Sequence, residues 1–371
     1  MAELVPPTPG QVLSTPVEQI SLLEKCAIVP ALLATLCTVA YAAVTAPFRG
    51  ETGTRTFREH VTYTALRTAV QRLTTRQLQF ISEPFSKIYE TWCKDNGYQP
   101  EFVTLKSGCK AFWMGNHRSA KYIMVYYHGG GFSLDGEDTH IKFYHEVQTT
   151  LKESGIPVAF LFLEYTLVPH ATYPTQVLEA VEAVNYVMTE LKRPASDIIL
   201  GGDSAGGNMC LAVLSHLTHP SSDFPELKLA EGDKLKAILC VAPWVHFGAQ
   251  WESSQRNIHK DFVSAYAGEM WARTYLGGKK SDYYTEAVEA PADWWKDAKV
   301  EQILCTVGSD ELLVDCISAW VKKYKSVNPE GITYVIGAHE AHIMPIMNVR
   351  FGLTKETEQG AAIKSWMKAR L

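Results

Sequence analysis

The sequence predicts an α/β fold, with a mostly parallel β-sheet and helices on both of its faces. Short runs rich in β-branched and aromatic residues alternate along the chain with longer segments of helical periodicity, such as TQVLEAVEAVNYVMTELK. This alternation is typical of parallel sheets, because a helix usually makes the crossover between parallel strands. The predicted strands are Tyr122–Tyr127, Val158–Leu163, Ile198–Gly201, Ala237–Ala242, Ile303–Val307 and Ile332–Ile336.

The composition indicates a folded protein with a substantial core and excludes several functions. The 371 residues are 46% hydrophobic and 20% charged. The formal net charge is −5 and no basic cluster is present, so nucleic acid is not expected as a partner. The eight cysteines include no CxxC pair, so neither a zinc site nor a disulfide framework is expected. No motif predicts a metal or an organic cofactor.

Residues 1–50 are interpreted as an N-terminal tail that contains a transmembrane anchor. The uncharged stretch at 26–48, CAIVPALLATLCTVAYAAVTAPF, is long enough to cross a bilayer as one helix. Arg49, Arg55 and Arg58 follow it, and by the positive-inside rule they favour a body on the cytosolic side. A single-pass anchor, with the endoplasmic reticulum as its membrane, is the first interpretation. The alternative is a buried cap helix in a soluble cytoplasmic protein.

Two further regions are expected to pack against the sheet. Residues 51–110 are interpreted as a helical cap region, because residues 56–95 within it combine apolar and charged positions at the spacing of two or three amphipathic helices. Residues 111–371 carry the sheet, interrupted by an insertion at about 244–300 that holds five of the nine tryptophans. An insertion with so many aromatic residues is expected to cover an apolar cavity.

Ser204 lies in the stretch GGDSAGGN, between a predicted strand and a predicted helix. Gly202 and Gly206 stand two positions on either side, where larger side chains would collide with the neighbouring strand and helix. This is the pattern of a nucleophile elbow, a sharp turn that exposes a serine for attack. The GDSGG string of chymotrypsin-like proteases is similar in letters, but that fold is all-β. The sequence therefore predicts that Ser204 is a nucleophile.

The stretch YYHGGGF at 126–132 follows the predicted strand that begins at Tyr122. Its glycines allow the backbone to pass close to the serine, with N–H groups directed at a substrate oxygen. We expect Gly129 and Gly130, together with the N–H of Ala205, to form an oxyanion hole. Gly131 is expected to complete the loop, and His128 is expected to pack beneath it as a structural residue.

These motifs resemble the hormone-sensitive-lipase branch of the α/β-hydrolases over roughly residues 90–371. HGGGF and GDSAGGN match its two hallmark motifs, and EYTLVPHATYP at 164–174 is similar to its DYRLAPE segment, with Glu164 for Asp and Thr166 for Arg. The resemblance implies an eight-stranded sheet, a catalytic domain over 111–371 and a cap built from residues 51–110 and the insertion. The layout also resembles membrane-anchored steryl-acetate deacetylases and esterases of secondary metabolites.

The resemblance places the catalytic acid after the seventh strand and the base after the eighth. Aligning GSDELLVD on the family pattern puts Glu311 at the acid position, with Asp310 as the alternative. GAHEAHIMP offers two histidines, and His342 fits the offset of the family's base better than His339.

Together these residues predict a serine carboxylic-ester hydrolase that acts on a lipophilic ester through an acyl-serine intermediate. An acyltransferase could use the same triad and is one alternative. A binding protein of this fold that has lost its triad is another. The expected partner is a small lipophilic ester, and the sequence indicates no oligomeric state.

Overall fold

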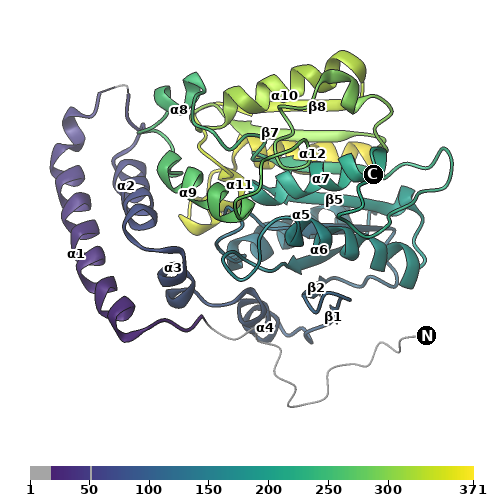
Figure 1. Ribbon diagram of the computed structural model, residues 1–371, viewed down its shortest axis with the longest axis horizontal. Coiled ribbons are helices and arrows are strands. Elements are labelled where there is room, and N and C mark those ends of the chain that lie inside the picture. Colours follow the sequence, from purple (N-terminus) through teal and green to yellow (C-terminus); the bar gives the residue numbers. More distant parts are fainter. Residues whose placement is uncertain (1–17, 51) are drawn as a thin grey trace.

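The computed structural model describes residues 18–50 and 52–371, which contain an eight-stranded sheet in the order β1-β2-β4-β3-β5-β6-β7-β8 (Figure 1). β2 pairs antiparallel with β1 and β4, and every other pair is parallel. The predicted α/β fold with a mostly parallel sheet is therefore confirmed. The strands are β1 Phe102–Thr104, β2 Lys110–Met114, β3 Tyr122–Tyr127, β4 Val158–Glu164, β5 Ile198–Asp203, β6 Ala237–Val241, β7 Ile303–Gly308 and β8 Ile332–Gly337.

The six predicted strands correspond to β3–β8, with ends that differ by at most two residues. The strands without a sequence prediction are β1 and β2, which form the antiparallel edge of the sheet. β1 has three residues and none is buried, so it lacks the apolar run that marks the central strands. Residues 102–104, inside the range expected to be helical, thus belong to the sheet.

Helices cover both faces of the sheet, and β3 shows how its residues divide between them. Ile123, Val125 and Tyr127 pack on one side with α6, α7 and α10, whereas Met124 and Tyr126 pack on the other with α4, α5 and α12. This alternation follows from the two-residue period of a strand. These six helices are α4 Phe85–Asp95, α5 Asp138–Glu153, α6 Thr175–Asn185, α7 Ala205–Thr218, α10 Val314–Val327 and α12 Glu358–Arg370.

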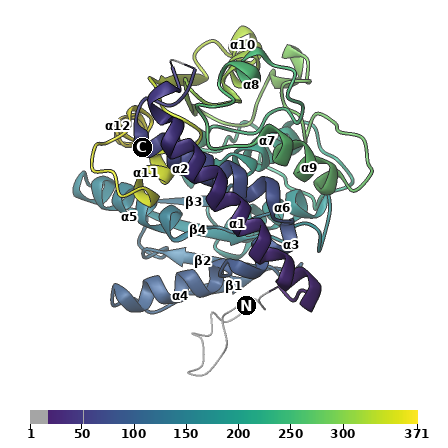
Figure 2. The same cartoon turned by 90° about the vertical axis from the view of Figure 1, so that its left-hand side faces the viewer.

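The remaining helices surround the carboxyl ends of the central strands. They are α1 Leu22–Thr45, α2 Phe57–Arg72, α3 Thr75–Ile81, α8 Glu252–Arg256, α9 Ala265–Leu276 and α11 Met344–Arg350. Capping boxes at Ser21 and Thr56 begin α1 and α2, because each side chain accepts the N–H of a glutamate three residues later. α1 and α2 pack side by side at one side of the molecule (Figures 1 and 2).

α1 carries the stretch that the sequence marks as an anchor. The span Leu22–Phe48 has a mean hydropathy of 2.1, and it alone among the described residues is long and apolar enough to cross a membrane. In the structure, Ile28, Thr35 and Ala42 form a buried stripe on this helix, and its other faces are largely exposed. The first 17 residues of the predicted tail lie outside the described part of the chain.

Candidate active site

Ser204 stands on a strained turn between β5 and α7. Its φ of 51° and ψ of −115° are unusual for a residue with a side chain, and its N–H donates to Val241 O at 2.9 Å. A Cβ on Gly206 would lie 1.8 Å from Tyr127 O, so only glycine allows α7 to pass β3 this closely. The turn has the local geometry of a nucleophile elbow, as the sequence predicts.

The loop after β3 differs among its three glycines in the partners of their N–H groups. The N–H of Gly129 donates to Asp203 Oδ1 at 3.0 Å, so this donor is already used inside the protein. The N–H groups of Gly130, Gly131 and Ala205 have no hydrogen-bond partner in the described part of the chain. All three glycines line the cavity that contains Ser204, and Gly130 and Gly131 are the two whose N–H groups are available to a bound oxygen.

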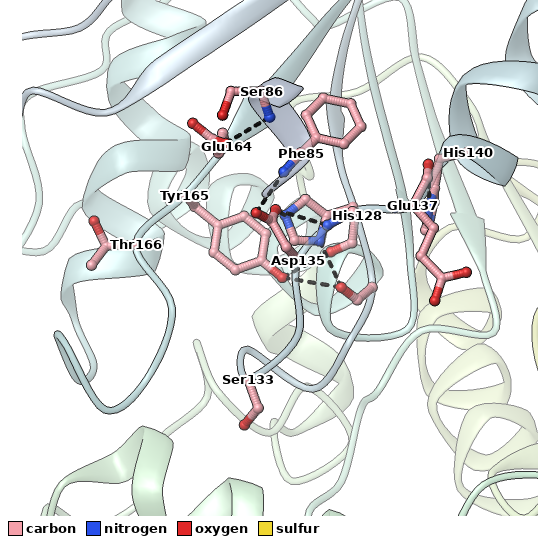
Figure 3. Close-up of polar contacts among 12 residues, drawn as sticks. Phe85, Ser86, His128, Ser133, Asp135, Glu137, His140, Glu164, Tyr165 and Thr166 are labelled. Carbon is pink, nitrogen blue, oxygen red and sulfur yellow. Dashed lines mark hydrogen bonds and ion pairs between the residues drawn. The ribbon is translucent and has the colours of Figure 1, made fainter. Parts of the chain in front are cut away.

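His128 lies beneath this loop, where the sequence places it (Figure 3). Its Nδ1 is 2.7 Å from Gly129 O, and its ring stacks on Tyr165 with centroids 4.2 Å apart. Burial lowers the pKa of His128 to about 4, so the imidazole is neutral near neutral pH. A buried, neutral ring in these contacts supports the loop, consistent with the expected structural role.

Two carboxyl groups tie the same region to the start of α4 (Figure 3). Asp135 accepts the N–H of Phe85 at 2.8 Å, and Glu164 accepts the N–H of Ser86 at 2.8 Å. Asp135 also lies 3.4 Å from Nε2 of His128. Glu164, which stands where the resembling family has an aspartate, thus accepts an N–H in the first turn of α4.

His342 and Glu311 form a buried pair. His342 Nδ1 is 3.4 Å from Glu311 Oε1, and the other oxygen of Glu311 accepts the N–H of Gly308 at 2.8 Å. Both side chains are almost fully inaccessible to solvent. Burial lowers the pKa of His342, but the hydrogen bond and charge of Glu311 outweigh it, and the pKa lies above the ordinary imidazole value.

Asp310 and His339, the alternative candidates for the acid and the base, lie near each other and apart from the His342–Glu311 pair. Asp310 Oδ2 lies 3.9 Å from His339, and its Oδ1 lies 4.0 Å from Lys260. His339 is 52% exposed, whereas His342 lines the cavity that contains Ser204. The geometry thus brings together Ser204, His342 and Glu311, and it leaves Asp310 and His339 outside this group.

The aromatic insertion supplies residues that the sequence analysis did not single out. Asp261, which is fully buried, accepts the N–H of Leu312 at 2.8 Å and the N–H of His342 at 3.3 Å. Asn257 donates to Glu311 O at 2.8 Å. These two side chains connect the loop of Glu311 to the loop of His342. Neither belongs to a recognisable motif, so no local sequence signal identifies them.

Ser204 and His342 line a cavity of about 390 Å³ between the sheet and the surrounding helices. Its wall is mostly apolar and includes Trp244 and Trp271 from the insertion and Leu32 from α1. The expected apolar cavity beneath the aromatic insertion is present. No group of three or more His, Cys, Asp or Glu side chains that could hold a metal occurs within residues 18–50 and 52–371.

Comparison with known proteins finds similar chains among hydrolases and esterases. Steryl acetyl hydrolase 1 of Saccharomyces cerevisiae is 25% identical over 61% of this chain, which spans 54% of that protein's length. An acetyl-hydrolase of Streptomyces hygroscopicus is 26% identical over 59% of the chain and 67% of its own length. The crystal structure of an esterase from the bacterial hormone-sensitive lipase family superposes with a TM-score of 0.62 at 21% identity. It covers 92% of this chain and 98% of its own.

The family comparison covers the segment that holds the whole candidate site. A family model described as the α/β-hydrolase fold matches residues 124–342, from the strand before the glycine loop to His342. The chain therefore belongs to the α/β-hydrolase fold family.

Proposed function

We propose that the protein is a serine carboxylic-ester hydrolase that acts on a lipophilic ester. One observation carries the proposal: a strained serine, a buried His342–Glu311 pair and unpaired backbone N–H groups converge on one apolar cavity. The same combination of nucleophile, base and oxyanion donors performs acyl transfer in serine hydrolases. The hydrolase names of the similar proteins agree with it.

In the proposed reaction, His342 takes the proton of Ser204 as the serine oxygen attacks the ester carbonyl. The carbonyl oxygen becomes an oxyanion held by the N–H groups of Gly130, Gly131 and Ala205. The bond to the alcohol then breaks, and the alcohol leaves with the proton from His342. Water, deprotonated by His342, hydrolyses the acyl-serine and releases the acid.

The outer face of α1 supports a lipophilic substrate and association with a membrane. Large apolar side chains are exposed along it: Leu22, Leu23, Val29, Leu33, Leu36, Tyr41 and Val44. Leu32 of the same helix lines the cavity. An apolar helix face next to a mostly apolar cavity suits an ester that partitions into a bilayer.

Ser204→Ala tests the proposal. The purified full-length protein is expected to hydrolyse p-nitrophenyl acetate or butyrate, and this variant is expected to reduce the rate by about 10⁶-fold, as loss of the nucleophile does in other triads. Circular dichroism and the melting temperature check that the variant folds. Retained activity in the folded variant would refute the assignment.

Product analysis separates hydrolysis from acyl transfer, which the same triad can perform. Acetylated sterols and terpenoids are incubated with the enzyme, with and without an added acceptor alcohol. A free acid product in both cases is expected. An acyl ester of the acceptor as the main product would assign the protein to the acyltransferases instead.

A further inference from the structure

We propose that Asp203 is the positioning residue of the oxyanion loop, Gly129–Gly131, and that Tyr126 and His140 hold it in place. The inference rests on the proposed ester hydrolysis, because it assigns a function to a residue behind the oxyanion hole of that reaction. None of these three side chains takes part in the proposed proton transfers.

Two hydrogen-bond donors and one histidine ring meet at the carboxyl group of Asp203. Asp203 ends β5, directly before the nucleophile, and is fully buried. Its Oδ1 accepts the N–H of Gly129 at 3.0 Å and the hydroxyl of Tyr126 at 2.5 Å, and Nε2 of His140 lies 3.4 Å away. Burial raises the pKa of Asp203, but His140 and Tyr126 outweigh it and hold the pKa below its ordinary value. The group is therefore a carboxylate.

The contact with Gly129 determines which donors remain for the substrate. A Cβ on Gly129 would lie 2.2 Å from Asp203 Oδ2, so the loop lies directly against the carboxylate. Because the N–H of Gly129 is turned towards Asp203, the loop's unpaired donors are the N–H groups of Gly130 and Gly131. Both glycines line the cavity. Asp203 thus fixes the orientation of the loop from behind.

His140 offsets the charge of this carboxylate. It is the third residue of α5, and the N–H of Glu137 donates to its Nδ1 at 3.0 Å. An accepting Nδ1 places the ring proton on Nε2, which faces Asp203. Without that proton, the carboxylate would oppose the negative charge that develops on the substrate oxygen nearby.

The first test compares Asp203→Ala with the conservative variant Asp203→Asn. In the alanine variant, kcat is expected to fall about 100-fold, as after loss of one oxyanion donor, with KM changed less than about threefold. Asparagine keeps an oxygen for the N–H of Gly129, so at least about tenfold of the lost kcat should return. Equal kcat values in the two variants, or a loss confined to KM, would overturn the inference.

A trifluoromethyl ketone gives a readout that a general structural defect would not reproduce. Such a ketone forms a hemiketal with Ser204, and its oxyanion occupies the hole. In Asp203→Ala its affinity is expected to fall in proportion to kcat/KM, while the affinity for the product alcohol stays unchanged. Undiminished affinity for the ketone would contradict a positioning role.

Tyr126 has a matched control in Tyr144. Both tyrosines are fully buried with ring centroids 4.4 Å apart, and of the two it is the Tyr126 hydroxyl that donates to Asp203. Tyr126→Phe is expected to lower kcat about fivefold, the effect of one buried hydrogen bond, whereas Tyr144→Phe should leave it unchanged. Equal losses in both variants would refute the role of Tyr126.

The Ser204→Ala variant separates failure of this inference from failure of the proposed function. Activity in that variant would reject the proposed function. An inactive Ser204→Ala, together with normal ketone binding in Asp203→Ala, would reject only the positioning role of Asp203.

Discussion

Glu311 and Asp310 are neighbours in sequence but face opposite surroundings. Glu311 is fully buried against His342, whereas Asp310 lies near His339 and Lys260. The choice between them therefore depends on where the chain turns after β7, which the residue types alone do not show.

Glu311→Ala and Asp310→Ala are expected to have very different effects. The first leaves His342 without its orienting partner and should lower kcat by about 10⁴-fold, as loss of a triad acid does elsewhere. The second should change kcat less than about threefold, because Asp310 does not contact His342. Initial rates with p-nitrophenyl butyrate measure both. A larger loss in Asp310→Ala would reverse the assignment.

The pH dependence of kcat/KM reports the protonation of His342. The base must be neutral to accept the serine proton, and its pKa lies above the ordinary value of 6.5. The acid limb of the profile is therefore expected at higher pH than for a free imidazole, with activity lost as the pH falls through it. Glu311→Gln removes the main stabilising charge, so the limb should move to lower pH. An acid limb of kcat/KM with its midpoint below pH 6.5 in the unsubstituted protein would contradict this expectation.

Single residues can be predicted from the sequence where a short motif determines the local backbone conformation. Ser204 could be predicted because the elbow is local. Gly129 is less suited than its neighbours to serve as an oxyanion donor, because its N–H donates to Asp203, which is distant in sequence. Asp261 could not be predicted either, since its contacts depend on how the insertion folds over the loops of Glu311 and His342.

At the element scale, the central strands were predictable because their apolar runs are buried on both faces. The edge strands β1 and β2 were not, since β1 has no buried residue and both strands are short. For α1, composition alone could not separate a membrane helix from a cap helix. Its buried stripe and its exposed apolar faces show features of both.

Charged substitutions on the outer face of α1 test the proposed membrane association. The double variant Leu33→Glu/Leu36→Glu places two carboxylates on exposed positions and should weaken binding to phosphatidylcholine vesicles at least tenfold, because charges are costly in the apolar layer. Vesicle flotation measures the bound fraction. Ile336→Glu, an exposed apolar position on β8, is the matched control and should bind normally. Equal flotation of both variants would argue against α1 as the contact surface.

At the scale of the whole molecule, the reactivity of the cysteine thiols depends on how tightly the chain is packed around them. All eight cysteines are free, and Cys26 and Cys37 on α1 are the exposed ones. Burial raises the pKa of Cys93 to about 11 and that of Cys109 to about 12, which suppresses the reactive thiolate.

Thiol titration with an aromatic disulfide reagent checks this packing. Two thiols are expected to react quickly in the native protein, and all eight after denaturation. Addition of phosphatidylcholine vesicles should slow the two fast reactions if α1 contacts the lipid. Rapid reaction of more than two thiols in the native state would show that the core is more open than the structure.

The position of Leu32 has a practical consequence for any study of this protein. Because α1 supplies part of the cavity wall, a truncated form without this helix would lack part of the wall around Ser204. Its preference among esters would then differ from that of the full chain, most for bulky alcohols. Substrate profiles are therefore best measured with α1 retained, in detergent or lipid.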